Sequence, residues 1–146
     1  MKIEIKKMEQ KHLDQIKDIL SSEFDEFWNA NVLSQELGNP ASTYIVALDE
    51  NENVVGYAGI WQPIDEAHIT NIVTKKDQRN QQIGAQMLEK LIELTKQRHL
   101  KSITLEVNAN NKPAISLYQK YHFQQVGRRK KYYHNTDDAL IMTLNV

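Results

Sequence analysis

The feature of this chain that most restricts its fold is a helical stripe of apolar residues between two strand-like segments. The apolar positions 83, 87, 88, 91, 92 and 94 share one helix face, which predicts an amphipathic helix from Ile83 to about Arg98. His68–Thr74 precedes this helix and Ser102–Val107 follows it, and both segments have the composition of strands. Grouped strands with helices between them favour a mixed α/β sheet.

The rest of the chain divides into further strands and helices by the same periods. The alternation of Ile3 and Ile5 with charged residues predicts a first strand within Met1–Lys7. Further strands are expected at Thr43–Leu48, Val54–Trp61, Phe123–Gly127 and Ala139–Leu144, and further helices over 13–20, over 32–37 and from the cap residue Asn111 to Tyr121. The sequence therefore predicts one α/β domain over residues 1–146, with a mixed central β-sheet of about seven strands flanked by about four helices.

Composition and missing motifs exclude several classes of protein. The chain of 146 residues has no cysteine, which excludes disulfides, thiolate metal sites and a cysteine nucleophile. Its longest apolar run, Tyr44–Leu48, is far shorter than the roughly 20 residues of a membrane span, and the N-terminus is charged where a signal peptide is apolar. We therefore expect a cytoplasmic protein without a membrane partner. The five histidines lack the spacing of metal ligands, and neither a Gly-x-Ser-x-Gly elbow nor a phosphate loop ending in Gly-Lys-Ser/Thr is present, which disfavours hydrolases and nucleotidases.

The net charge of −1 hides an uneven distribution of charge along the chain. Residues 1–74 contain five lysines and thirteen acidic residues, whereas residues 75–131 contain thirteen basic residues and four acidic ones. A basic segment of this size is typical of a protein with a polyanionic ligand. Helix faces and hairpins that are simply solvated by charge would have the same composition.

The segment Arg79–Ala85, with the sequence RNQQIGA, joins the end of a predicted strand to the start of the long helix. The free N–H groups and the dipole at such a helix start bind anions, and the ligand expected here is a pyrophosphate. On these seven residues alone, an ordinary strand-to-helix turn is the simpler interpretation.

Two motifs together carry a resemblance to a known family. Arg79–Ala85 resembles the Arg/Gln-x-x-Gly-x-Gly/Ala motif of the GNAT N-acetyltransferases, and Asn111–Tyr118, NKPAISLY, is similar to the second signature of that superfamily. Leu105–Val107, Lys131–Tyr133 and Asp138–Met142 narrow the resemblance to the bacterial ribosomal-protein alanine N-acetyltransferases. The likeness extends over essentially the whole chain.

The resemblance implies acetyl-CoA as co-substrate and assigns residues to its binding. Backbone at the end of the fourth strand would hold the acetyl group and stabilise its oxyanion, at Ile72, Val73 and Thr74. The pyrophosphate loop would comprise Asn80, Gln81, Gln82, Ile83, Gly84 and Ala85, and the last helix would add Asn111. By the same resemblance, Glu106 would be the general base and Tyr118 the general acid, and no metal would be required.

Two residues depart from the pattern of the family. Gln82 replaces the first glycine of the motif, so the backbone can approach a pyrophosphate closely only with this side chain turned outward. His122 stands where the family has glycine before Phe123. A non-glycine residue in a left-handed cap costs on the order of 1–2 kcal/mol, so we expect either strain or a different turn at this position.

The resemblance implies that the acceptor is the N-terminal α-amine of a protein, with alanine at that end and a ribosomal protein as the partner. Acetylation of a lysine side chain or a small amine would use the same cofactor residues and stays open. Arg128–Tyr133 mixes basic and aromatic residues, which also occurs in RNA-binding modules. Because the run is short for a nucleic-acid site, we interpret it as a substrate-facing hairpin loop. The sequence does not indicate an oligomeric state.

Overall fold

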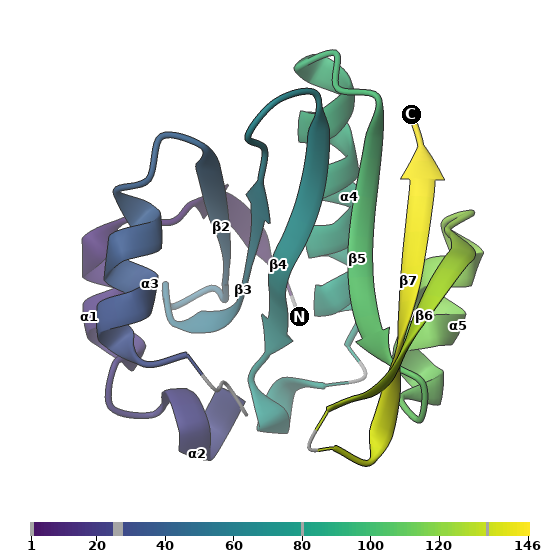
Figure 1. Cartoon of the computed structure of the whole chain (residues 1–146). Helices are drawn as coiled ribbons and strands as arrows, with labels where there is room; N and C mark the ends of the chain where they lie inside the picture. The colour runs from purple at the N-terminus through teal and green to yellow at the C-terminus, as the bar shows by residue number, and fades with distance from the viewer. Residues whose placement is uncertain (1, 25–27, 80, 134) are drawn as a thin grey trace.

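The computed structural model describes residues 2–24, 28–79, 81–133 and 135–146, which are organised around a seven-stranded sheet of order β1-β2-β3-β4-β5-β7-β6 (Figure 1). The strands are β1 (Glu4–Lys7), β2 (Ser42–Leu48), β3 (Val54–Trp61), β4 (Glu66–Thr74), β5 (Ser102–Asn108), β6 (Gln124–Tyr133) and β7 (Asp137–Asn145). β4 and β5 pair in parallel, and the other neighbours are antiparallel. The mixed sheet predicted from the sequence is confirmed.

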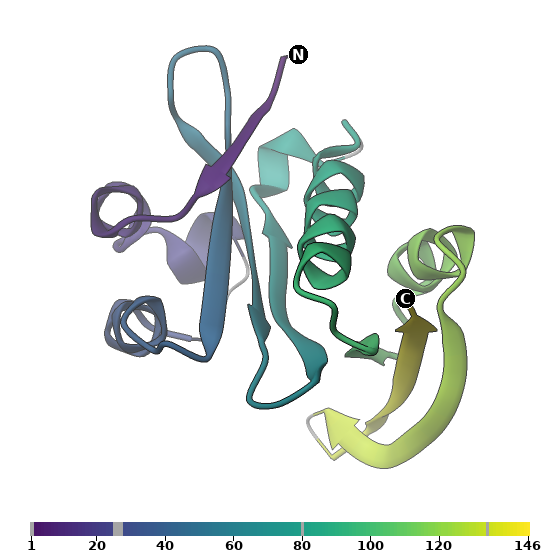
Figure 2. The same cartoon turned by 90° about the horizontal axis from the view of Figure 1, so that it is seen from above.

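Helices cover both faces of this sheet (Figure 2). One face carries α1 (Gln10–Ile16), α2 (Leu20–Phe24) and α3 (Ala30–Leu37), and the other carries α4 (Ile83–Gln97) and α5 (Lys112–Lys120), with a 3₁₀ turn, η1 (Lys76–Gln78), after β4. The described residues thus form five α-helices where about four were predicted. The helix expected over 13–20 is interrupted, because the N–H of Ile19 donates to the carbonyl of Ile16 at 3.0 Å in a tighter turn, after which α2 begins.

The strands divide their side chains between two apolar cores, because successive residues of a strand point to opposite faces. In β2, Tyr44 and Val46 belong to the core beneath α1–α3, whereas Ile45 and Ala47 belong to the core beneath α4 and α5. The second core includes four residues of the predicted helical stripe, each at most 1% exposed: Ile83, Met87, Leu88 and Leu91. The stripe therefore anchors α4 across the middle of the sheet.

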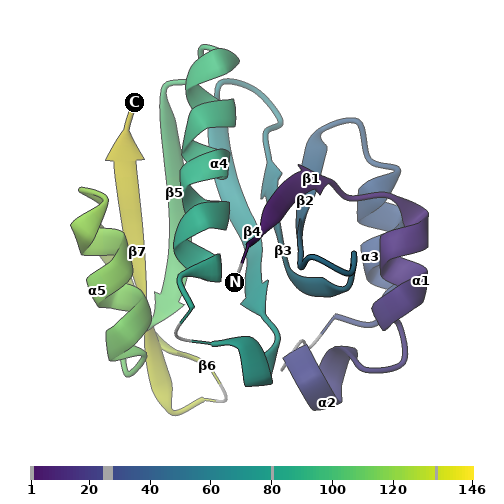
Figure 3. The ribbon, with the colours of Figure 1, turned by 180° about the vertical axis from the view of Figure 1, so that it is seen from behind.

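β4 and β5 are paired over only part of their length. The gap that opens between them beyond the paired residues is where the candidate site lies. Their register joins Glu66–His68 to Ser102–Thr104, and beyond these residues the two strands diverge toward their C-terminal ends (Figure 1). A bulge bends β4 here, since Ile69 and Asn71 pair with consecutive residues of β3 and leave Thr70 as the extra residue. α4 and α5 both begin at this end of the sheet (Figure 3).

β6 is longer than the sequence predicts. The expected strand ended at Gly127, but β6 continues to Tyr133, so the run that begins at Arg128 is strand and not loop. Asp138 on β7 holds this extension: its Oδ2 accepts a hydrogen bond from Arg128 Nη1 at 2.5 Å, and its Oδ1 accepts the N–H of Lys131 at 2.9 Å. These two donors, the Lys131 N–H first, hold the pKa of Asp138 below its usual value. An exposed edge strand needs no alternation of apolar and polar residues, so the sequence periodicity did not predict the part of β6 after Gly127.

Candidate active site

A groove of about 1060 Å³ lies where β4 and β5 diverge, beside the first turns of α4 and α5. Seven predicted cofactor residues line it: Ile72, Thr74, Gln82, Ile83, Gly84, Ala85 and Asn111. Val73 points to the other face of β4 and packs against the core beneath α1–α3, and Gln81 is not part of the lining. The prediction for Asn80 falls outside the described residues. The fold thus brings two distant sequence motifs into one groove.

The start of α4 has the features of a helix N-terminus that is suited to an anion. Gln82 is the N-cap, with the left-handed angles φ 62° and ψ 20°, and it is an exposed residue at the rim of the groove. The first turn of α4 contains no acidic residue, and the first N–H groups of a helix have no acceptor within it. A Cβ on Gly84 would meet only Thr74 Oγ1, at 3.8 Å, so the missing side chain leaves room in the groove. These residues fit a pyrophosphate.

The charged residues of the groove are few. Arg79 and Lys120 line it, together with the acidic Glu89. The phenol of Tyr121 donates a hydrogen bond to the carboxylate of Glu89, and this bond is the main cause that raises the pKa of Tyr121. Most of the basic excess of residues 75–131 therefore lies outside the described lining of the groove.

The backbone of β4 presents alternate residues to the gap beside β5. The N–H of Lys75 donates to the carbonyl of Val55 on β3 at 2.8 Å. Strand alternation turns the N–H of Val73 toward β3 as well, and those of Ile72 and Thr74 toward the gap. Ile72 and Thr74 are therefore better placed than Val73 to donate a hydrogen bond to an acyl oxygen in the groove.

Caps at both ends of α5 position Tyr118. At the start, Asn111 Oδ1 accepts a backbone N–H of the first turn at 3.3 Å. At the end, His122 has φ 73°, its N–H donates to the carbonyl of Gln119 at 2.9 Å, and the N–H of Phe123 donates to the carbonyl of Tyr118 at 3.0 Å. These two bonds form a Schellman motif. Of the two outcomes expected at His122, strain or a different turn, the structure has the first, a left-handed cap with histidine in the place of glycine.

Tyr118 lies on the buried face of α5. It is 6% exposed, and its ring packs against Phe123 with the two centroids 5.8 Å apart. Burial, with a smaller contribution from Tyr133, raises the pKa of the Tyr118 phenol to about 12. The phenol therefore stays protonated near neutral pH, as a proton donor must. Tyr118 itself is not part of the groove lining, but Leu117 and Tyr121 of the same helix are.

Glu106 projects from the face of β5 that is opposite α4 and α5. Its side chain is 29% exposed, and its Oε1 lies 3.4 Å from Nη2 of Arg129 on β6. Its Oε2 is buried and has no hydrogen-bond partner in the part of the chain that the structure describes. A buried acceptor without a donor is unfavourable, so this oxygen is suited to accept a proton or hydrogen bond from an incoming group.

Tyr133 connects the surroundings of Glu106 and Tyr118. Burial and then the charge of Glu106 raise the pKa of Tyr133, and Tyr133 in turn contributes to the raised pKa of Tyr118. The two predicted catalytic side chains thus share one electrostatic neighbour. Motif matching pointed to Lys131–Tyr133 only by resemblance, and nothing in the sequence indicated that Arg129 pairs with Glu106.

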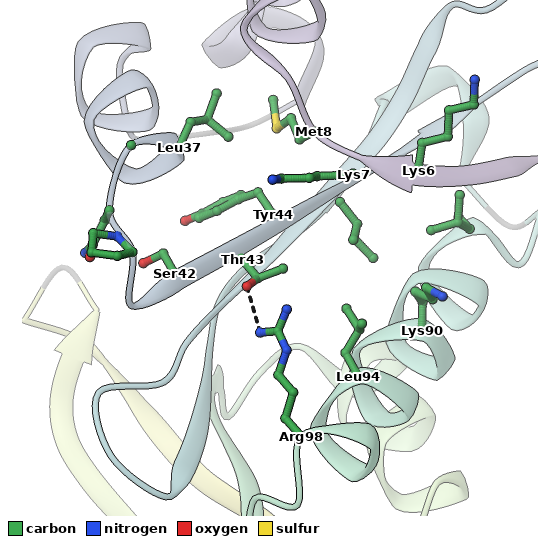
Figure 4. Close-up of a pocket in the computed structure, with 15 residues that line it drawn as sticks. Lys6, Lys7, Met8, Leu37, Ser42, Thr43, Tyr44, Lys90, Leu94 and Arg98 are labelled. Carbon is green, nitrogen blue, oxygen red and sulfur yellow. Dashed lines mark hydrogen bonds between the residues drawn. The ribbon is translucent and has the colours of Figure 1, made fainter.

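A second cavity, of about 590 Å³, lies elsewhere, between β1, the start of β2 and the C-terminal half of α4 (Figure 4). Lys7, Lys90 and Arg98 contribute to its lining. Figure 4 shows Arg98 reaching toward β2, where its Nη1 donates to Thr43 Oγ1 at 2.8 Å. Lys90 Nζ lies 3.5 Å from a Glu93 carboxylate oxygen. None of the predicted site residues that the structure describes lines this cavity.

The described residues offer neither a metal centre nor a membrane-spanning helix. They contain no group of three or more histidine or carboxylate side chains that could hold a metal ion. No helix among them combines the length and the apolar composition that crossing a bilayer requires. His12, one of the five histidines considered from the sequence, has a structural partner, since its Nδ1 accepts the N–H of Glu9 at 2.9 Å.

The sheet splays between β4 and β5, and the groove with the two motifs lies beside the starts of α4 and α5. The sequence profile of the acetyltransferase (GNAT) family matches residues 13–123, and the chain belongs to this family. The chain is therefore an N-acetyltransferase, and acetyl-CoA is its co-substrate. The enzyme class and the co-substrate predicted from the two motifs are confirmed.

More specific likenesses narrow the comparison within the family. A Bacillus subtilis protein, provisionally named ribosomal protein bS18-alanine N-acetyltransferase, is 35% identical over 147 residues, which cover 99% of this chain and 97% of that protein. The ribosomal protein bS18-alanine N-acetyltransferase of Escherichia coli K12 is 35% identical over 102 residues, 68% of this chain and 69% of its own. The crystal structure of the Escherichia coli ribosomal-protein-S18-alanine N-acetyltransferase matches with a TM-score of 0.89 and 26% identity, covering 99% of this chain and 94% of that one. The predicted resemblance is confirmed.

Gly84→Glu is expected to weaken acetyl-CoA binding by at least about ten-fold, equivalent to roughly 1.4 kcal/mol, while the fold is kept. A Cβ has room at this position, but a carboxylate at the start of α4 would crowd and repel a pyrophosphate. Titration calorimetry on the folded variant measures the effect. Gly84→Ala separates crowding from charge, and Gln35→Glu, exposed on α3, adds the same charge away from the groove and should bind like wild type. Unchanged affinity of folded Gly84→Glu would refute the loop assignment.

Proposed function

We propose that this enzyme acetylates the N-terminal α-amine of a protein, with alanine as the acceptor residue and ribosomal protein bS18 as the first candidate. The observation that carries the proposal is the 35% identity, over nearly the full length of both chains, to the Bacillus subtilis protein that bears this activity in its name. The fold match to the Escherichia coli enzyme adds support. A ribosomal acceptor would also place the reaction in the cytoplasm.

In this proposal the groove residues bind and orient acetyl-CoA. The N–H groups at the start of α4, around Ile83 and Gly84, hold the pyrophosphate, and Asn111 adds a polar contact from the start of α5. The N–H groups of Ile72 and Thr74 face the gap between β4 and β5, where they donate hydrogen bonds to the acyl oxygen as charge develops on it.

Glu106 and Tyr118 move the protons of the reaction. An α-amine has a pKa of about 7.7–8.0, so a carboxylate suffices to remove its proton as the nitrogen attacks. Oε2 of Glu106 accepts that proton, directly or through a water, while the nitrogen bonds to the acetyl carbon and the carbon–sulfur bond breaks. The phenol of Tyr118 gives its proton to the departing sulfur, whose thiol has a reference pKa of about 8.5. Solvent then reprotonates Tyr118 and removes the proton from Glu106.

A lysine side chain is the competing acceptor, and the chemistry separates the two. A lysine amine has a reference pKa of about 10.4 and is almost wholly protonated at pH 7, so an enzyme with a single carboxylate base obtains far less neutral nucleophile from it. The RNA-binding interpretation of Arg128–Tyr133 is the weaker one for a chain that belongs to an enzyme family.

The test is a thiol-release assay with acetyl-CoA and three acceptors at pH 7.5. These are a peptide with a free N-terminal alanine, a lysine-containing peptide with a blocked N-terminus, and a polyamine. We expect release of CoA with the alanine peptide and little above background with the others, with one acetyl group found on the α-amine by mass spectrometry. Acetylation confined to lysine side chains or to the polyamine would overturn the proposed acceptor.

A further inference from the structure

Arg129 and Glu106 meet on one face of the sheet, although β7 separates their strands. Glu106 pairs with Ile141 on β7, and Arg129 pairs with Ala139 on the same strand. Residues 139 and 141 point to the same face, and paired residues share a face, so Arg129 reaches diagonally across β7 toward Glu106. The buried Ala139 has only a methyl group, which leaves space for this crossing.

The position of Arg129 is fixed by its surroundings. Its guanidinium carbon lies 5.3 Å from the centroid of the Tyr132 ring, a cation–π distance. Arg128, directly before it, and Lys131, two residues after it, both donate to Asp138 and hold this part of β6 against β7. Since the arginine side chain is 54% exposed, its ion pair with Glu106 contributes little to the stability of the fold. The ion pair matters instead for where it places the two oxygens of the Glu106 carboxylate.

The two oxygens of Glu106 are in unequal positions. Oε1 faces Arg129, whereas Oε2 is buried and has no hydrogen-bond partner among the described residues. We infer that Arg129 is a positioning residue for Glu106: by holding Oε1 it fixes the carboxylate so that Oε2 is left to accept the proton of the acceptor amine. This inference rests on the proposed role of Glu106 as the base.

The test is a double-mutant cycle read as kcat and KM. Arg129→Gln should lower kcat about ten-fold, the order expected when a reacting group is misplaced, with the KM for acetyl-CoA unchanged. Arg129→Lys, which keeps the charge, should recover most of the rate. In the Glu106→Gln background, Arg129→Gln should lower kcat by less than about two-fold, because its effect acts through the carboxylate. Arg98→Gln removes an exposed arginine and its contact with Thr43, and it should have wild-type kcat.

Three results would overturn the inference, and they are distinguishable. Full additivity of the two substitutions, with Glu106→Gln strongly impaired, would reject the role of Arg129 while leaving Glu106 as the base. An effect of Arg129→Gln on the KM for the acceptor peptide alone would make Arg129 a substrate contact. A wild-type kcat for Glu106→Gln would remove the base itself and with it the reason for positioning it.

Discussion

Glu106→Gln is expected to lower kcat by about 10²–10⁴, the range typical of a lost general base. Glutamine has nearly the same size as glutamate and can still contact Arg129, but it cannot take a proton from the amine. Raising the pH from 7 to 9 should restore part of the rate, because more of the α-amine is then neutral before it attacks. Steady-state kinetics over this pH range, with a peptide that begins with alanine, provides the measurement.

A control of the same chemistry is available on a neighbouring strand. Glu66 is exposed at the start of β4, and Glu66→Gln should leave kcat and both KM values unchanged. If Glu106→Gln retains the wild-type rate at pH 7, the amine must lose its proton elsewhere, and the buried Oε2 would need another explanation. A loss of rate with no recovery at high pH would favour an effect on acceptor binding over one on proton transfer.

The fold was predictable to the extent that periodicity reports burial. The helix that begins at Ile83 and the strand Val54–Trp61 both have residues in the cores, and both occur within one residue of the predicted bounds. The two failures, the length of β6 and the break after Ile16, have different causes. β6 continues past Gly127 because it pairs along β7, and its side chains are mostly exposed, so no alternation marked it. The break after Ile16 is a local tightening of the backbone that leaves the apolar spacing unchanged.

The candidate site was predictable wherever a motif coincides with a backbone feature. Gln82 and Gly84 mark the start of α4, and Asn111 marks the start of α5, so motif and helix cap indicate the same positions. The direction of Val73 required the observed register of β4, because the bulge at Thr70 changes which residues face the gap. Sequence spacing cannot report such a shift.

The pairing of Arg129 with Glu106 could not be predicted from the sequence, because it depends on the order and register of the strands. It depends on the order β5-β7-β6, in which the last strand of the chain lies between the other two. It also depends on register shifts along β6, after Gln125 and after Arg129. A one-residue slip would turn the arginine to the opposite face of the sheet. Arg128 shows the alternative, because it bonds Asp138 and not Glu106.

Tyr118→Phe is expected to lower kcat by about 10², at the lower end of the range for a lost general acid, because a thiolate is already a tolerable leaving group. The KM for acetyl-CoA should change little, since the proton is given only as the carbon–sulfur bond breaks. High pH should not rescue this variant, in contrast to Glu106→Gln. A Tyr118→Phe enzyme with near wild-type kcat would remove Tyr118 from the mechanism and leave it as a core residue.

The stability of wild type and of Tyr118→Phe at high pH tests the environment of Tyr118 without any assay of activity. A phenol whose pKa is about 12 in the folded protein and about 10 in the unfolded chain favours folding below pH 10, and this contribution is lost as the pH rises from 10 through 12. At pH 11 wild type should have lost roughly 1–1.5 kcal/mol of its free energy of unfolding by this route, and Tyr118→Phe none. Urea unfolding at pH 9 and pH 11 measures both. Equal losses in the two proteins would mean that the phenol is solvated, and a solvated phenol would titrate near its ordinary pKa and be a stronger acid than the buried one described here.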